Sequence, residues 1–218
     1  MNELRFTLIT DGSSDIALMN VVKWLLDDLY PELPNIGKHA NFTILPDPPK
    51  TSEVQKRLNF AKEYYPFDIL IYHRDAESID INIISQRIQE IKNQVLEENK
   101  DLIVCVVPVK MMETWLLIND EAIKKASGNR GYKGNMNLPN CNKLEKIQDP
   151  KQLLHSILKE TSGLKSRRLK KFNVHEAVHL VAENIENFSI LRELNSFLQF
   201  EKDLKIAVDN FIGIQFLD

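Results

Sequence analysis

The chain has 218 residues, of which 43% are hydrophobic and 27% charged, and its 28 Lys and Arg residues against 31 Asp and Glu residues give a formal net charge of -3. This composition is typical of a folded protein with one domain of ordinary size and an appendage, or with two small domains. A pI near 6.0 excludes a protein that coats nucleic acid through an overall positive charge, so any such contact needs a local basic patch.

The cysteine content and the hydropathy of the chain limit its compartment. Cys105 and Cys141 are the two cysteines of the sequence, which excludes a disulfide framework and a Cys-rich zinc site. The first twelve residues lack the apolar core of a signal peptide, and no apolar stretch approaches the roughly 20 residues of a membrane helix. We expect a cytoplasmic protein without membrane contact, and homo-oligomer formation stays open.

Short apolar runs alternate with helical patterns over the first 126 residues. Because these runs are continuously apolar, both faces of the sheet should be covered, and the alternation with helices predicts parallel pairing through right-handed crossovers. Residues 1–126 are therefore predicted to form an α/β domain. The expected strands are residues 4–10, 40–46, 67–73 and 101–109, and the expected helices are 13–30, 52–64 and a segment that carries Ile84, Ile88, Ile91 and Val95.

The pattern changes after residue 126. Residues 127–140 contain three of the seven glycines and are predicted to form a mobile surface loop, and the rest of the chain is helical in pattern. Residues 127–218 are therefore expected to be an all-α C-terminal extension. Capping boxes are predicted at Ser52 with Gln55 and at Ser196 with Gln199. The closing helix should bury Phe197, Phe200, Leu204 and Val208.

Acidic residues follow three of the expected strands. Asp11 follows the first strand, Asp75 and Glu77 follow the third, and Glu113 follows the fourth. Ligands of an open parallel sheet bind outside the carboxyl ends of its strands, so these carboxylates should converge if the first and third strands are neighbours. Clustered carboxylates repel one another, whereas Mg²⁺ binds one or two carboxylates together with waters and substrate phosphates. The pattern therefore indicates chemistry on a phosphate.

A simpler explanation exists for part of this pattern. Acidic residues are common at helix N-termini, where they complement the helix dipole, and Asp11 or Glu77 could have that role alone. Glu113 is harder to explain in this way, because its neighbours Met112, Trp115 and Leu116 are apolar and an unpartnered carboxylate is costly there.

The segments ITDGSSD, IYHRDAES, VPVKMMETWLL, DPKQLL and SFLQFEKDL resemble a TOPRIM-like, OLD-nuclease-like family of bacterial proteins found in phage-defence regions, often near genes for ATPases. The resemblance runs from Thr10 to about Leu204. It implies a TOPRIM-like parallel sheet and a metal-binding carboxylate site, with Asp11 at the position of the glutamate of the fold and with Asp75 and Glu77 at its D-x-D positions. Asp11 is one methylene shorter than that glutamate and Glu77 one longer than an aspartate, so compensated metal binding and loss of catalysis both stay open.

Basic residues supply candidate phosphate ligands. The run of residues 164–171 holds five basic residues and no acidic one, and such a run binds nucleic acid through its phosphates with an affinity that falls with salt. A solvated basic linker, or a surface that docks an acidic partner, is the alternative. Arg74 and Lys110 are expected to neutralise phosphate at the carboxylates. The basic residues of the run are Lys165, Arg167, Arg168, Lys170 and Lys171.

Residues 175–179 read HEAVH and match the H-E-x-x-H pattern, in which two histidines bind zinc and the glutamate is the general base of a peptidase. The pattern lacks an evident third ligand. The alternative is an ordinary amphipathic helix, with His175 exposed and His179 packed beside Leu180.

Nucleotide-hydrolysis, dinucleotide-binding and nucleophile-elbow motifs are absent from the sequence. The carboxylate pattern, together with the resemblance to the TOPRIM-like family, implies a Mg²⁺- or Mn²⁺-dependent nuclease or phosphoryl-transfer component that acts on nucleic acid. The resemblance alone implies a role in anti-phage defence and a partner ATPase. Asp11, Asp75 and Glu77 would bind the metal, and Glu113 would be a further metal ligand or general base. The alternative is a non-catalytic module of the same fold that docks a partner ATPase or binds a nucleotide.

Overall fold

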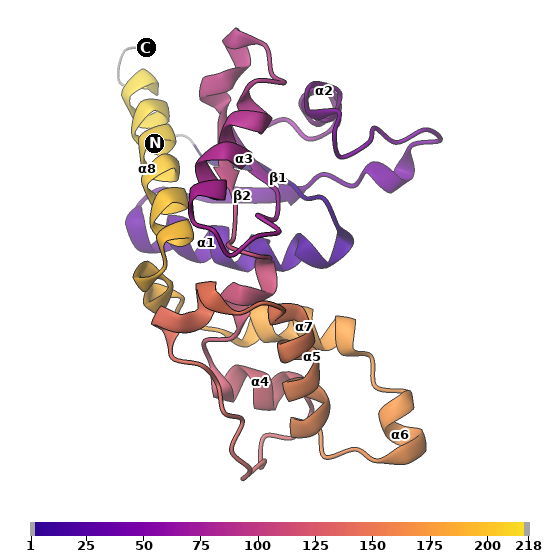
Figure 1. Cartoon of the computed structure of the whole chain (residues 1–218). Coiled ribbons are helices and arrows are strands. Elements are labelled where there is room, and N and C mark those ends of the chain that lie inside the picture. Colours follow the sequence, from indigo (N-terminus) through magenta and orange to yellow (C-terminus); the bar gives the residue numbers. More distant parts are fainter. Residues whose placement is uncertain (1–2, 216–218) are drawn as a thin grey trace.

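Four short strands form a single parallel sheet in the order β2-β1-β3-β4, which is an α/β arrangement as expected. The computed structural model describes residues 3–215 (Figure 1). β1 lies between β2 and β3, so the connection from β1 to β2 and the connection from β2 to β3 run in opposite directions across the sheet. The carboxyl ends of β1 and β3 therefore lie side by side at the point where the strand order reverses. The strands are β1 (Leu4–Ile9), β2 (Asn35–His39), β3 (Ile69–His73) and β4 (Ile103–Val106).

The prediction of the second strand was wrong. Residues 35–39 form β2, whereas Phe42–Ile44, inside the expected strand, form a 3₁₀ helix behind an Asn41 cap. Gly37 explains how so polar a segment can pair with β1: a Cβ atom there would lie 2.2 Å from the Phe6 ring. Only a residue without a side chain leaves room for the Phe6 ring at this position of β2. The sequence of β2 has no apolar pattern from which this strand could be predicted.

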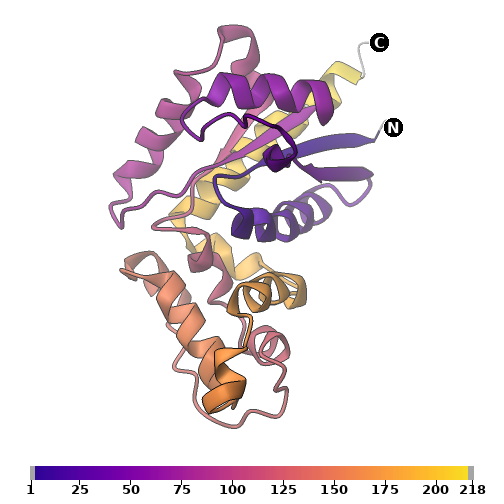
Figure 2. The same cartoon turned by 90° about the vertical axis from the view of Figure 1, so that its right-hand side faces the viewer.

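Helices cover both faces of the sheet. Leu4, Phe6 and Leu8 of β1 pack into one apolar cluster with α1 and α8, while Ile9 and Tyr72 belong to a second cluster with α2 and α3 on the other face. Figure 2 shows the strands between α1 on one side and α2 on the other. The covering helices are α1 (Leu18–Leu29), α2 (Val54–Tyr64), α3 (Asn82–Lys92) and α8 (Asn195–Gln215).

Residues 127–215 form helices and irregular connections and contain no strand, and residues 127–140 form a long irregular segment, as expected. The last of these helices, α8, returns to the sheet and buries Phe197, Phe200, Leu204 and Val208 beside β4. Buried residues of α4, α5 and α7 belong to the same continuous cluster as α1 and the sheet. These helices are α4 (Asp120–Ala126), α5 (Pro150–Thr161), α6 (Ser166–Lys170) and α7 (Val174–Asn184).

Both predicted capping boxes were wrong, because their side chains have other partners. Gln55 Oε1 accepts a hydrogen bond from the Leu96 backbone, and α2 begins after Glu53 instead. The Ser196 hydroxyl accepts the indole N–H of Trp115. The connections contain the 3₁₀ helices η1 (Ser13–Ala17), η2 (Phe42–Ile44), η3 (Glu97–Leu102), η4 (Met112–Leu116), η5 (Cys141–Lys146) and η6 (Ser189–Glu193). Over the described residues, no helix combines the length and apolarity that crossing a membrane requires.

Candidate functional site

The carboxyl ends of β1 and β3 border an open cleft with a volume of about 310 Å³. Four residues that the sequence singled out lie together there because β1 and β3 are neighbours in the sheet. The sequence reading missed the other lining residues, which come from the segment before α2, from α3 and from the residues after it. The cleft is lined by Asp11, Thr51, Ser52, Arg74, Asp75, Glu77, Arg87 and Gln94.

Arginine side chains hold the Asp11 carboxylate on both oxygens. Arg57 Nη1 donates to Asp11 Oδ1 at 3.0 Å, and Arg74 Nε lies 3.6 Å from Asp11 Oδ2. Arg57 is buried, donates also to Tyr72 Oη and lies 4.5 Å above the centre of the Phe42 ring. A buried guanidinium without a negative partner would be costly, so Arg57 and Asp11 stabilise each other. Arg57 was missed because its position in the α2 pattern does not distinguish it from a solvent-facing arginine.

The Asp75 carboxylate is fixed from behind by two donors. Its Oδ1 atom accepts hydrogen bonds from the Met112 backbone at 3.0 Å and from His73 Nε2 at 3.1 Å. His73 is fully buried, and its Nδ1 atom lies 3.5 Å from Asp15 Oδ2, an ion-pair distance. Burial alone would lower the pKa of His73, but Asp75, Asp15 and Asp11 outweigh it and raise that pKa. The sequence reading did not single out either His73 or Asp15.

Glu77 and Lys110 lie at paired turns with unusual backbone angles. Their φ values are +57° and +62°, in the left-handed region that non-glycine residues enter at a cost of about 1–3 kcal/mol each at strained sites. The Glu77 N–H donates to the Lys110 carbonyl at 2.9 Å, and Lys110 Nζ donates to the Glu77 carbonyl at 3.1 Å. These hydrogen bonds hold the strained turns together, and the Glu77 side chain stays 77% exposed with Arg87 at 3.3 Å.

Glu113 does not line the cleft. Its side chain is 3% exposed in η4, and Lys151 Nζ from α5 lies 3.3 Å from its carboxylate. Burial raises the pKa of Glu113, and the nearby charge of Asp75 adds to the rise, while a backbone hydrogen bond and Lys151 oppose it. Glu113 therefore lies behind the site and not in it. It is adjacent in sequence to Met112, whose backbone N–H donates to Asp75.

The oxygen donors of the cleft fit a hard divalent cation. Across residues 3–215, no three His, Cys, Asp or Glu side chains are grouped so that they could hold a metal ion by themselves. Mg²⁺ does not need such a group, because it binds through one or two carboxylates with waters and substrate phosphates. Asp75, with Asp11 in the same cleft, supplies that donor set, and Arg74 and Arg87 supply partners for a phosphate.

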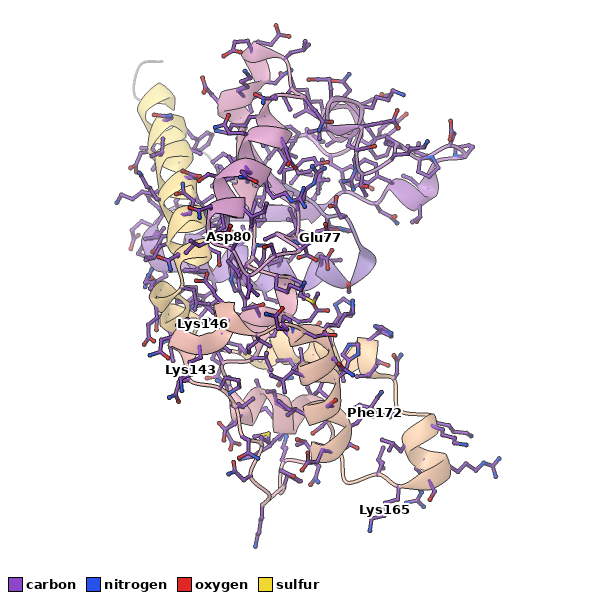
Figure 3. All side chains as sticks on the ribbon, in the orientation of Figure 1. Glu77, Asp80, Lys143, Lys146, Lys165 and Phe172 are labelled. Carbon is purple, nitrogen blue, oxygen red and sulfur yellow. The ribbon has the colours of Figure 1, made fainter. Side chains whose placement is uncertain are left out.

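The basic run is remote from this cleft. Its five basic residues lie on and beside the short helix α6, all are exposed, and none forms an ion pair within the described part of the chain. Figure 1 shows α6 projecting from the far end of the helical part. Glu77 and Lys165 lie well apart in Figure 3, so the structure does not bring the run to the carboxylates.

The HEAVH segment lies on α7. The Glu176 carboxylate accepts a hydrogen bond from Asn173, whose own side chain caps the helix, and the exposed His175 ring packs edge-on against His155 with 5.3 Å between ring centres. Burial, followed by the neighbouring His175, lowers the pKa of His155. Glu176 therefore has a structural partner at the N-terminus of its helix.

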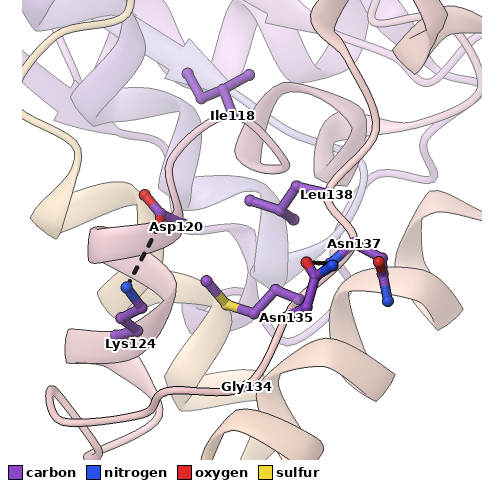
Figure 4. Close-up of a pocket in the computed structure, with 8 residues that line it drawn as sticks. Ile118, Asp120, Lys124, Gly134, Asn135, Asn137 and Leu138 are labelled. Atoms are coloured by element: carbon purple, nitrogen blue, oxygen red, sulfur yellow. Dashed lines mark hydrogen bonds and ion pairs between the residues drawn. The ribbon is translucent and has the colours of Figure 1, made fainter.

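A separate pocket lies between α4 and the segment 134–138, with a volume of about 310 Å³ (Figure 4). Asp120 and Lys124, which line it, pair with each other at 3.4 Å. Its charged lining residues therefore neutralise one another, and the sheet-edge cleft is the better candidate site.

Compared with protein-family models, curated proteins and solved structures, the chain gives no match.

Proposed function

We propose that this protein is a Mg²⁺- or Mn²⁺-dependent nuclease, or a related phosphoryl-transfer enzyme, with a TOPRIM-like fold and a role in anti-phage defence. One observation carries the chemical part of this proposal: two carboxylates, Asp11 and Asp75, share a cleft with Arg74 and Arg87 at the carboxyl edge of a parallel sheet. Carboxylates suit a divalent cation, and guanidinium groups suit the phosphate that it would contact. The family and the defence role depend on the sequence resemblance alone.

The residues of the cleft divide into two roles under this proposal. Asp75 and Asp11 would hold the metal, with Glu77 at the rim of the same cleft, and the bound ion would stabilise negative charge on the phosphoryl group. Arg74 also donates to the Thr51 carbonyl at 3.0 Å, so its guanidinium is already oriented along the cleft. A phosphate oxygen could replace Asp11 as its second partner, because their 3.6 Å separation is a loose ion pair.

The basic residues of α6 would add a second contact with nucleic acid. Exposed lysines and arginines that have no acidic partner release counterions when they neutralise phosphates, which gives affinity without sequence preference. Their distance from the cleft means that they would bind the polymer rather than the phosphate that reacts.

The test is the double substitution Asp75→Ala with Glu77→Ala in the purified protein. We expect divalent-dependent cleavage of single- or double-stranded nucleic acid by the wild type and its loss in the double variant. The matched control is Glu97→Ala with Glu98→Ala, which removes two carboxylates from the exposed η3 segment and should keep full activity. Cleavage that is equal in both double variants would dismiss this site.

A non-catalytic module that docks a partner ATPase or binds a nucleotide is the second candidate. Arg57 and Arg74 favour it, because they already engage both oxygens of Asp11, which is also the shorter acid at the position of the fold's glutamate. Calorimetric titration with Mg²⁺ or Mn²⁺ separates the candidates. A nuclease should release or absorb heat on binding the ion, and this heat should be lost in Asp75→Ala. A docking module should show no heat of ion binding.

A further inference from the structure

Beneath the cleft, the buried ring of His73 lies between two carboxylates that belong to different turns. We propose that His73 is a positioning residue that ties the turn carrying Asp11 to the turn carrying Asp75. This inference deepens the proposed function, since it concerns how that same site is held in shape. His73 is fully buried and does not line the cleft, so it would act through Asp15 and Asp75 rather than on a ligand.

On one side of the ring, Asp15 controls the turn after β1. Asp15 Oδ2 accepts the Gly12 N–H at 2.9 Å, and Asp15 Oδ1 accepts the Ser14 hydroxyl at 3.0 Å. The Thr10 hydroxyl donates to the Gly12 carbonyl at 2.8 Å, so this turn is bonded on both sides of Asp11. A shift of the Asp15 carboxylate would therefore shift the backbone that carries Asp11.

On the other side, His73 and η4 fix Asp75. His73 Nε2 and the Met112 N–H both bind Oδ1 of the Asp75 carboxylate, which leaves Oδ2 as the oxygen without a hydrogen bond within residues 3–215. The Asp75 side chain is 32% exposed and lines the cleft. The two donors thus hold the carboxylate by one oxygen and leave the other for a ligand.

A histidine serves this position for its donors and not for its volume. Its neighbours along β3 are apolar, and a polar ring buried among them is costly unless its nitrogen atoms have partners. A leucine would fill similar space at lower cost, but it would lose the hydrogen bond to Asp75 and the ring nitrogen that lies 3.5 Å from Asp15 Oδ2. A glutamine can place an amide N–H near the position of Nε2, so it keeps the bond to Asp75 alone.

The experiment compares His73→Leu, His73→Gln and Leu70→Ala, a buried control on the opposite face of β3 that destabilises the sheet without touching the site. Mn²⁺ affinity is measured calorimetrically. Loss of groups that orient a metal ligand typically weakens metal binding about 10- to 100-fold, which we expect for His73→Leu. We expect His73→Gln to stay within about threefold of the wild type through the retained bond to Asp75, and Leu70→Ala to be unchanged.

A metal-free readout keeps this inference separate from the proposed function. The Gly12 amide donates to Asp15 and the Met112 amide donates to Asp75, so the hydrogen exchange rates of these two amides report on the two carboxylates beside His73. In His73→Leu both amides should exchange faster than the global loss of stability explains, whereas in Leu70→Ala they should follow that loss. If the wild type binds no Mn²⁺, the proposed function fails but the exchange result still decides the role of His73.

The inference is overturned if Gly12 and Met112 exchange in His73→Leu no faster than global unfolding predicts, or if the wild type binds Mn²⁺ and His73→Leu binds it as tightly as Leu70→Ala does. Should His73→Leu fail to fold, His73→Gln provides the same comparison. It should make the Gly12 amide exchange faster and leave Met112 protected. Protection of Gly12 in His73→Gln equal to that in the wild type would also overturn the proposal.

Discussion

Charged side chains at the sheet edge bind one another, whereas those on α6 face solvent without ion-pair partners in the described chain. In the cleft, Asp11 is paired with Arg57 and Arg74, and Asp75 accepts a hydrogen bond from the buried His73. Similar charges therefore serve different purposes in the two regions. Paired, partly buried charges define a geometry and resist salt, while exposed cations contribute affinity that salt removes.

The largest effect is expected from breaking the paired charges of the cleft. Arg57→Ala removes the buried partner of Asp11 and should lower the free energy of unfolding by about 3 kcal/mol. This is the low end of the range for a broken buried ion pair, because the Asp11 side chain is 29% exposed. Lys100→Ala, at the exposed pair with Glu97, should cost at most about 1 kcal/mol. Urea unfolding of both variants measures the difference, and equal losses would refute the distinction between the two kinds of pair.

The second prediction concerns the exposed cations. Replacement of Lys170 and Lys171 by Gln should lower the slope of log affinity against log salt for a nucleic acid by about two, since each lost phosphate contact lowers it by about one. The control, Lys143→Gln with Lys146→Gln on η5, changes the net charge equally and should keep the slope. Fluorescence anisotropy over a salt series measures both. A change of equal size in the two double variants would show that net charge, not α6, sets the affinity.

The third prediction uses Glu113, a buried charge with one cationic neighbour. Its raised pKa means that ionised Glu113 destabilises the folded state relative to the unfolded one, so this cost is absent at low pH. As pH rises through the ordinary and then the raised pKa, Glu113→Gln should become progressively more stable relative to the wild type, and the gain should then level off. Thermal unfolding between pH 4 and pH 8 tests this. Glu186→Gln, at an exposed pair with Lys125, should show no such trend.

The smallest effect is expected at the HEAVH segment. Glu176→Ala removes a side-chain partner of the α7 cap, should cost about 0.5–1 kcal/mol of unfolding free energy, and should leave any nuclease activity intact. Glu183→Ala, exposed on the same helix, is the control and should be neutral. We also expect no stoichiometric zinc after purification without chelator. Elemental analysis that finds one zinc per chain, lost in His175→Ala, would favour a peptidase instead.

The elements that local pattern determines were predicted correctly. Continuous apolar runs identified β1, β3 and β4, and the recurring Ile84, Ile88 and Ile91 identified α3, because burial selects residue type at each position of a regular element. The convergence of Asp11 and Asp75 followed as well, since parallel neighbouring strands end at the same edge.

Tertiary contacts decided what the pattern could not show. The polar segment of β2 pairs with β1 because Gly37 admits the Phe6 ring, and Ser196 receives the indole of Trp115 instead of capping its helix. His73 looks like any polar residue at a strand end until the fold places Asp15 and Asp75 on its two sides. Hydrogen bonds and ion pairs act over about 3–4 Å between residues far apart in the chain, so only the packing of the elements selects these partners.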